Sequence, residues 1–249
     1  MPSSVNSVAL RENLSELIRH PSPSRNEAGV ARLSTEVLGG HGFSVARDAI
    51  GNLLARRGDG PLIMLNAHMD TTQDRRDVAQ IRNGGLLRPR LDLNYGFDDK
   101  VGVAIILTLA GIRHLSFGVL LTVQEEIGMI GAEAVAPSSY DDITCCLSLD
   151  RGGYDQMVIS IEGRELAPAS WVDGVDAALR KGGFVFHRTE GLVCDAIHIS
   201  RHLPTLNFSV GYYEWHTRYE FVKVQEALRT AKAMRWLIEN PDLMASSAD

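Results

Sequence analysis

The chain has 249 residues, of which 45% are hydrophobic, so it is long enough for one large α/β domain with a sizeable core. Its formal charge of −6 at pH 7 and the lack of a long run of Lys and Arg exclude a basic track for nucleic acid or for a membrane surface. No apolar run reaches the roughly 18 residues that span a bilayer, and the polar N-terminus has no signal-peptide stretch, so we expect a cytoplasmic protein.

The first third of the chain predicts two helices followed by short strands. Apolar residues at roughly helical spacing predict a helix over residues 8–18 that ends before Pro21. A second helix is expected at residues 27–38, where a group of glycines ends it. Runs typical of strands follow at residues 43–46, 53–56 and 62–67. The last run is apolar apart from Asn66, as expected of a strand buried on both faces.

The rest of the chain alternates strands with helices. Residues 74–92 are polar and interrupted by glycine, and we expect a loop or a short hairpin there. Further strands are expected at residues 119–123, 143–149, 157–161, 183–186 and 206–210. Helices are expected at residues 101–112, 171–180 and 221–238. This alternation predicts an α/β fold, with a mixed, mostly parallel central sheet flanked by helices in three α/β/α layers.

The cysteines limit the kind of metal site that the chain can build. Cys145, Cys146 and Cys194 form no Cys-x-x-Cys pair, and an odd count with one adjacent pair is not a disulfide framework. The adjacent pair lies in an apolar run, so we expect buried strand residues. A zinc site in this chain must therefore use histidine and carboxylate ligands.

Four of the expected strands are followed closely by an acid or a histidine. These residues are His68 and Asp70 after the third strand, Glu125 and Glu126 after the fourth, Asp150 after the fifth, and His216 a few residues after the last. In an open α/β sheet, ligands collect beyond the carboxyl ends of the strands, because the loops converge there. The repeated placement therefore predicts one shared site.

The residue types at these strand ends suit a pair of metal ions. Zinc accepts histidine nitrogen and carboxylate oxygen, and catalytic zinc sites leave a position open for water. Two metals roughly 4 Å apart need a bridging carboxylate, which Asp98 or Asp99 offers just before an expected helix. Taken singly, each motif is also typical of a helix cap, an acidic first turn or a core histidine. Together and in this order they favour a metal site.

The order of the motifs resembles that of the zinc exopeptidases of the tripeptidase T and leucyl-aminopeptidase type. That superfamily has His-x-Asp, then Asp-Asp or Asp-Asn before a helix, then Glu-Glu, then Asp, then a C-terminal His. The matching segments are His68-Met-Asp70, Asp98-Asp99, Glu125-Glu126, Asp150 and His216, with lesser echoes at Pro23-Ser24, Glu27, Gly51-Asn52 and Gly131-Ala132. The match runs from about residue 8 to residue 238.

The resemblance implies a centre with two divalent metal ions. His68, Asp98 and Asp150 would hold one ion, and Asp98, Glu126 and His216 would hold the other. Zinc is the expected metal, although cobalt and manganese suit the same ligands.

The resemblance also implies roles for residues beside the ligands. Glu125 would be the general base that takes a proton from a bridging water. Asp70 would orient the ring of His68, as carboxylates commonly do behind metal-bound histidines. A cis peptide is expected between Asp98 and Asp99, as in the superfamily.

The expected function is hydrolysis of amide bonds in small peptides, by an aminopeptidase or a di- or tripeptidase. A deacylase of N-acyl amino acids with the same centre stays open. So do a glutaminyl cyclase-like transferase, which works with one zinc, and a remnant that binds metal without activity. The oligomeric state is also open.

The spacing of the motifs bears on domain organisation. Tripeptidase T has a second domain inserted after the fourth ligand, and relatives that form large tetrahedral particles have one between the first and second ligands. The intervals between Asp150 and His216 and between His68 and Asp98 are too short for either insertion. Residues 1–249 are therefore expected to form a single catalytic domain without a lid or dimerisation domain.

Overall fold

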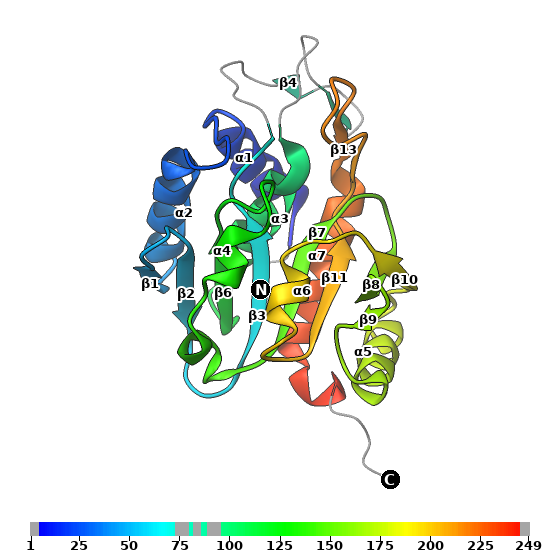
Figure 1. Ribbon diagram of the computed structural model, residues 1–249. Helices are drawn as coiled ribbons and strands as arrows, with labels where there is room; N and C mark the ends of the chain where they lie inside the picture. Colours follow the sequence, from blue (N-terminus) through cyan, green and yellow to red (C-terminus); the bar gives the residue numbers. More distant parts are fainter. Residues whose placement is uncertain (1–4, 73–79, 82–85, 89–95, 245–249) are drawn as a thin grey trace.

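The computed structural model describes residues 5–72, 80–81, 86–88 and 96–244 (Figure 1). The loop or hairpin expected at residues 74–92 can be followed only in β4 (Gln80–Ile81) and β5 (Leu86–Arg88), which pair antiparallel. The remainder of that segment lies outside the described residues.

A large mixed sheet forms the middle layer. Its strands are β1 (Ser44–Arg47), β2 (Leu53–Arg57), β3 (Leu62–His68), β6 (Phe117–Thr122), β7 (Ile143–Arg151), β8 (Gln156–Ile161), β9 (Arg164–Glu165), β10 (His187–Gly191) and β11 (Thr205–Ser209). The order is β1-β2-β6-β3-β7-β11-β8-β10, with β9 paired to β8. The central strands β6, β3, β7 and β11 run parallel, whereas the pairs β1–β2, β2–β6 and β8–β11 are antiparallel. The predicted mixed sheet with a parallel centre is confirmed.

Helices cover both faces of this sheet. They are α1 (Ser7–Leu17), α2 (Ala28–Gly40), α3 (Phe97–Ala110), α4 (Ile130–Glu133), α5 (Ala169–Lys181), α6 (Ala196–Ile199) and α7 (Val224–Glu239). Helices α1, α3 and α7 pack together on one face, and the short α4 and α6 lie on the other (Figure 1). No described helix combines the length and the apolar character that a membrane span needs.

Residues of β3 alternate between two hydrophobic clusters, as the pleat requires. Leu65 on β3 joins the larger cluster, which includes all the apolar core residues of α3. Met64 joins a smaller cluster with Leu120 of β6 and Ile199 of α6. A sheet buried on both faces explains why β3 is apolar along nearly its whole length.

The structure corrects one expected strand and the start of one expected helix. Residues 183–186 are not a strand; β10 begins at His187, and Phe186 instead packs its ring edge-on to Phe208, with 5.2 Å between the centroids. An apolar run indicates that residues are buried. Here Phe186 is buried by side-chain packing and not by pairing in a strand. The expected helix at residues 221–238 begins later, because β13 (Phe221–Lys223) pairs with β12 (Tyr212–Tyr213) and β5 in a small second sheet.

Candidate metal centre

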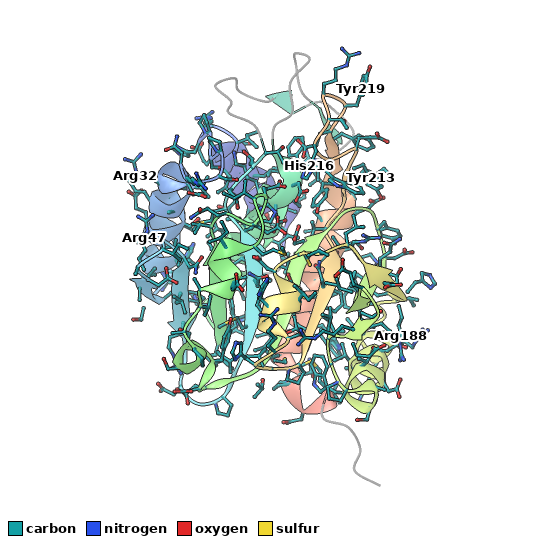
Figure 2. The ribbon with its side chains drawn as sticks, in the orientation of Figure 1. Arg32, Arg47, Arg188, Tyr213, His216 and Tyr219 are labelled. Carbon is teal, nitrogen blue, oxygen red and sulfur yellow. The ribbon has the colours of Figure 1, made fainter. Side chains whose placement is uncertain are left out.

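The predicted site residues meet at the carboxyl edge of the central strands. His68 ends β3 opposite Thr122 of β6, and Asp150 lies at the end of β7. His216 follows β12 and lies above the central strands in the view of Figure 2. A cavity of about 290 Å³ opens there, and its lining includes His68, Asp98, Glu125, Glu126, Asp150 and His216.

Two groups of side chains in this cavity have the composition of metal sites. One is His68, Asp98 and Asp150; the other is Asp98, Glu126 and His216. Within each group the ligand atoms all lie within 4.8 Å of one another. The structure therefore brings together all five residues that the resemblance implied as ligands.

Asp98 belongs to both groups. Its Oδ1 is 3.2 Å from Nε2 of His68, and its Oδ2 is 3.1 Å from Nε2 of His216. Asp150 Oδ1 is 3.7 Å from the same His68 nitrogen, and Glu126 Oε1 is 2.9 Å from Nε2 of His216. One carboxylate thus faces both histidines, which is the geometry of a bridging ligand.

Buried acids crowd this centre. Burial raises the pKa of Asp150 well above its ordinary value, and the charges of Asp99 and Asp98 add to the rise. Burial likewise raises the pKa of Glu125 to about 8, with further contributions from neighbouring carboxylates. The negative charges of these carboxylates repel one another in a low-dielectric cavity, and a divalent cation would offset that repulsion. The donor set fits a metal ion on this ground.

Both histidines face carboxylates. Burial lowers the pKa of His68, but the charge of Asp150 and hydrogen bonds with Asp70 and Asp98 raise it well above its ordinary value. Hydrogen bonds with Asp98 and Glu126 raise the pKa of His216 to about 10. A positive charge at these ring nitrogens is therefore stabilised, whether a proton or a metal ion supplies it.

Asp70 supports the centre from behind. Nδ1 of His68 is 3.0 Å from the backbone oxygen of Asp70 and 3.4 Å from its carboxylate. The carboxylate accepts hydrogen bonds from the backbone N–H groups of Glu125 at 2.9 Å and Glu126 at 3.2 Å. It also accepts one from the hydroxyl of Ser24 at 2.7 Å. Asp70 thus contacts the His68 ring and the Glu pair at once.

The predicted cis peptide between Asp98 and Asp99 is present. Asp99 itself is turned away from the histidine rings, because its carboxylate accepts hydrogen bonds from the backbone N–H groups of His68 and Gly102. The backbone N–H of Asp98 donates to Glu220 at 3.1 Å. Asp98, and not its neighbour, is therefore the residue that faces both histidines.

We compared the sequence with those of known proteins. No model of a known protein family matches the chain. An uncharacterised protein of Bacillus subtilis, YqjE, is 28% identical over 148 residues, which cover 53% of this chain and 40% of that protein. A putative [LysW]-lysine/[LysW]-ornithine hydrolase of Pyrococcus furiosus is 38% identical over 76 residues, which cover 30% of this chain and 23% of that protein. The chain thus matches less than half the length of these curated relatives.

Solved structures match over nearly the whole chain. An aminopeptidase PepT from Bacillus cereus has a TM-score of 0.85 at 18% identity, covering 96% of this chain and 99% of the other. A tripeptidase from Staphylococcus aureus has a TM-score of 0.84 at 15% identity, covering 97% and 100%. The chain has the fold of these solved peptidases. An aminopeptidase of the archaeon Desulfurococcus kamchatkensis shares it with a TM-score of 0.78 at 17% identity, covering 98% of each chain.

Two further residues beside Asp150 were not predicted from the sequence. The side chain of Asn207 on β11 bonds to both the backbone N–H and the backbone oxygen of Asp150, each at 2.9 Å. The hydroxyl of Tyr212 donates to Asp150 Oδ1 at 3.1 Å. The available signal was that both positions lie at or just beyond the last expected central strand, which is the same clue that pointed to His216.

Proposed function

We propose that this protein is a two-metal hydrolase that cleaves amide bonds of small peptides, with zinc as its metal. The observation that carries the proposal is the position of Asp98 between two histidine–carboxylate groups, His68 with Asp150 and His216 with Glu126. The peptidase names of the solved structures that share the fold also support it. In this proposal a small peptide is the substrate.

The metal ions, when bound by these ligands, supply an activated water and polarise the scissile carbonyl. Glu125 then acts as the general base. Its Oε2 lies 3.9 Å from Nε2 of His68, at the side of the first ligand group and inside the cavity. From there the carboxylate takes a proton and delivers it to the leaving amine nitrogen. Asp70 holds the backbone of Glu125 and the ring of His68 in place.

We also propose that the chain works as a single catalytic domain. The segments between Asp150 and His216 are β8 to β12 with α5 and α6. Strands β8 to β11 belong to the main sheet, and α6 packs on β11. These contacts leave this interval within the catalytic fold, in support of a protein without an inserted lid.

The test is an assay of purified protein loaded with zinc, cobalt or manganese. Dipeptides with a free amine are the expected substrates, and N-acyl amino acids are the comparison, because a deacylase would use the same centre. Elemental analysis should find two metals per chain. If the protein hydrolyses neither substrate class, the proposal is wrong. If each chain binds one metal, the two-metal centre is wrong.

Replacement of the general base tests the mechanism. Glu125→Gln should lower kcat about 10²- to 10⁴-fold, because the proton acceptor is lost while the ligands remain. Metal content should stay unchanged. The matched control is Glu133→Gln, which alters an exposed acid on α4 and should leave kcat unaffected. An unaltered kcat in Glu125→Gln would remove Glu125 from the mechanism.

A further inference from the structure

An arginine lies in the cavity beside the candidate metal ligands. Arg151 ends β7 immediately after Asp150, and both residues line the cavity. Apart from Arg151, the charged groups of the described lining are the two histidines and the carboxylates of Asp98, Glu125, Glu126 and Asp150. An arginine at the wall of an otherwise acidic cavity has no role in holding a metal cation.

The guanidinium of Arg151 is fixed at one end and free at the other. Its Nε donates a hydrogen bond to Oε1 of Gln156 at 2.9 Å. Gln156 is itself anchored, because its backbone N–H donates to the hydroxyl of Ser209 at 2.9 Å. Within the described part of the chain, the two terminal nitrogens of Arg151 have no hydrogen-bond or ion-pair partner. The two terminal nitrogens of this partly buried fork therefore remain as donors for an acceptor that the described residues do not supply.

Another part of the cavity wall is apolar. Leu192 and Val193 follow β10 and line the cavity with 64% and 42% of their surfaces exposed. Trp215, which is 38% exposed, also lines it beside the candidate ligand His216. Large exposed apolar side chains that gather around a polar centre are typical of a ligand site. The cavity volume, about 290 Å³, lies at the small end of such sites.

We propose that Arg151 is a specificity residue that binds the free carboxylate of a short substrate. The substrate class is then a di- or tripeptide, or an N-acyl amino acid, with an apolar side chain that packs on Leu192 and Val193. Arg151 suits this role because a planar guanidinium binds a carboxylate through two parallel hydrogen bonds. The inference rests on the proposed function, since it names the substrate of the same cavity.

The first experiment compares two substrates that differ only at the carboxylate, leucyl-leucine and leucyl-leucinamide. The wild-type protein should show kcat/KM about 10- to 100-fold higher for the acid, the range expected of a hydrogen-bonded charge pair. Arg151→Gln should remove this preference by raising KM for the acid, while the rate with the amide stays within about twofold. The unchanged amide rate shows that the variant is folded. Arg151→Lys should retain part of the preference, because the charge remains without the fork.

The matched control is Arg32→Gln, which removes the same charge from the exposed face of α2, far from His216 in Figure 2. It should keep the preference for the acid. Equal kcat/KM for acid and amide in the wild type, or an unchanged preference in Arg151→Gln, would overturn the inference.

A binding measurement separates this inference from the proposed function. Calorimetry with the same two peptides is done on metal-loaded Glu125→Gln protein, in which hydrolysis should be too slow to disturb the titration. It should give tighter binding of the acid when Arg151 is present and equal binding of both peptides when Arg151→Gln is added. If neither peptide is cleaved but this pattern holds, the proposed function fails and the role of Arg151 stands. If peptides are cleaved but acid and amide bind alike, the inference fails and the proposed function stands.

Discussion

The hydroxyl of Ser24 joins the N-terminal segment to the candidate metal centre. The hydroxyl of Ser24 donates to the carboxylate of Asp70, which also holds the backbone of Glu125 and Glu126. The serine is kept in place by its neighbours, because Thr71 donates its backbone N–H to the oxygen of Ser22 at 2.8 Å. A residue that is distant in sequence thus orients the carboxylate behind His68.

Ser24→Ala should weaken metal binding about 10-fold, because loss of a carboxylate's supporting hydrogen bond loosens the histidine that it orients. Titration of the metal-free protein with zinc against a competing chelator measures this directly. The matched control is Ser138→Ala, which alters an exposed serine in the 3-10 turn at Pro137–Tyr140. Equal zinc affinity in Ser24→Ala and the wild type would show that Asp70 needs no support from this hydroxyl.

At the scale of elements, the centre depends on how closely α3 approaches β7. Every residue of α3 is buried, and Gly102 lies one turn after the Asp98–Asp99 pair. A Cβ at position 102 would lie 2.2 Å from the backbone oxygen of Leu149 and 2.5 Å from the carboxylate of Asp99. The glycine therefore permits the contact between the helix that carries Asp98 and the strand that carries Asp150.

Gly102→Ala should destabilise the protein by about 3 kcal/mol, because the added Cβ would overlap the backbone oxygen of Leu149 and the carboxylate of Asp99. The control is Gly39→Ala in α2, where a Cβ meets nothing within 4 Å. That change should stabilise the protein by about 0.5–1 kcal/mol through helix propensity. Urea unfolding of both variants measures the difference. A Gly102→Ala variant as stable as the wild type would mean that α3 and β7 can separate at little cost.

At the scale of the whole molecule, one buried acid links stability to pH. Asp195 is 1% exposed and accepts a hydrogen bond from the hydroxyl of Thr122, joining the start of α6 to the end of β6. Burial raises the pKa of Asp195 from 3.8 to about 6. The folded state therefore binds the carboxyl proton of Asp195 more tightly than the unfolded chain does. Protonated Asp195 contributes fully to stability at low pH, and this contribution is lost as the pH rises through about 6.

Asp195→Asn stays neutral at every pH and should escape this loss. Between pH 5 and pH 7 the wild type should lose about 1 kcal/mol of unfolding free energy relative to the variant. Urea unfolding at a series of pH values gives both curves. Asp59→Asn, which alters an exposed acid between β2 and β3, is the control and should follow the wild type. Parallel curves for Asp195→Asn and the wild type would contradict the raised pKa.

Local patterns in the sequence determined the fold class and the candidate site. The apolar runs predict the order of strands and helices, because a strand that is buried on both faces of a parallel sheet is apolar along nearly its whole length. The polar residues that follow those runs gave the positions that the fold then collects at one edge, since parallel strands end together. The cis peptide followed from the resemblance, and it is present.

Only the tertiary structure decided the features that depend on contacts between distant segments. Asp98 faces the histidines because Asp99 is held by backbone groups of β3 and α3. Residues 221–223 form a strand because β5 and β12 pair with them. Arg151 lines the cavity together with Leu192 and Trp215, which are distant from it in sequence. A local pattern reports what a residue prefers, whereas its neighbours across the sheet fix where it points.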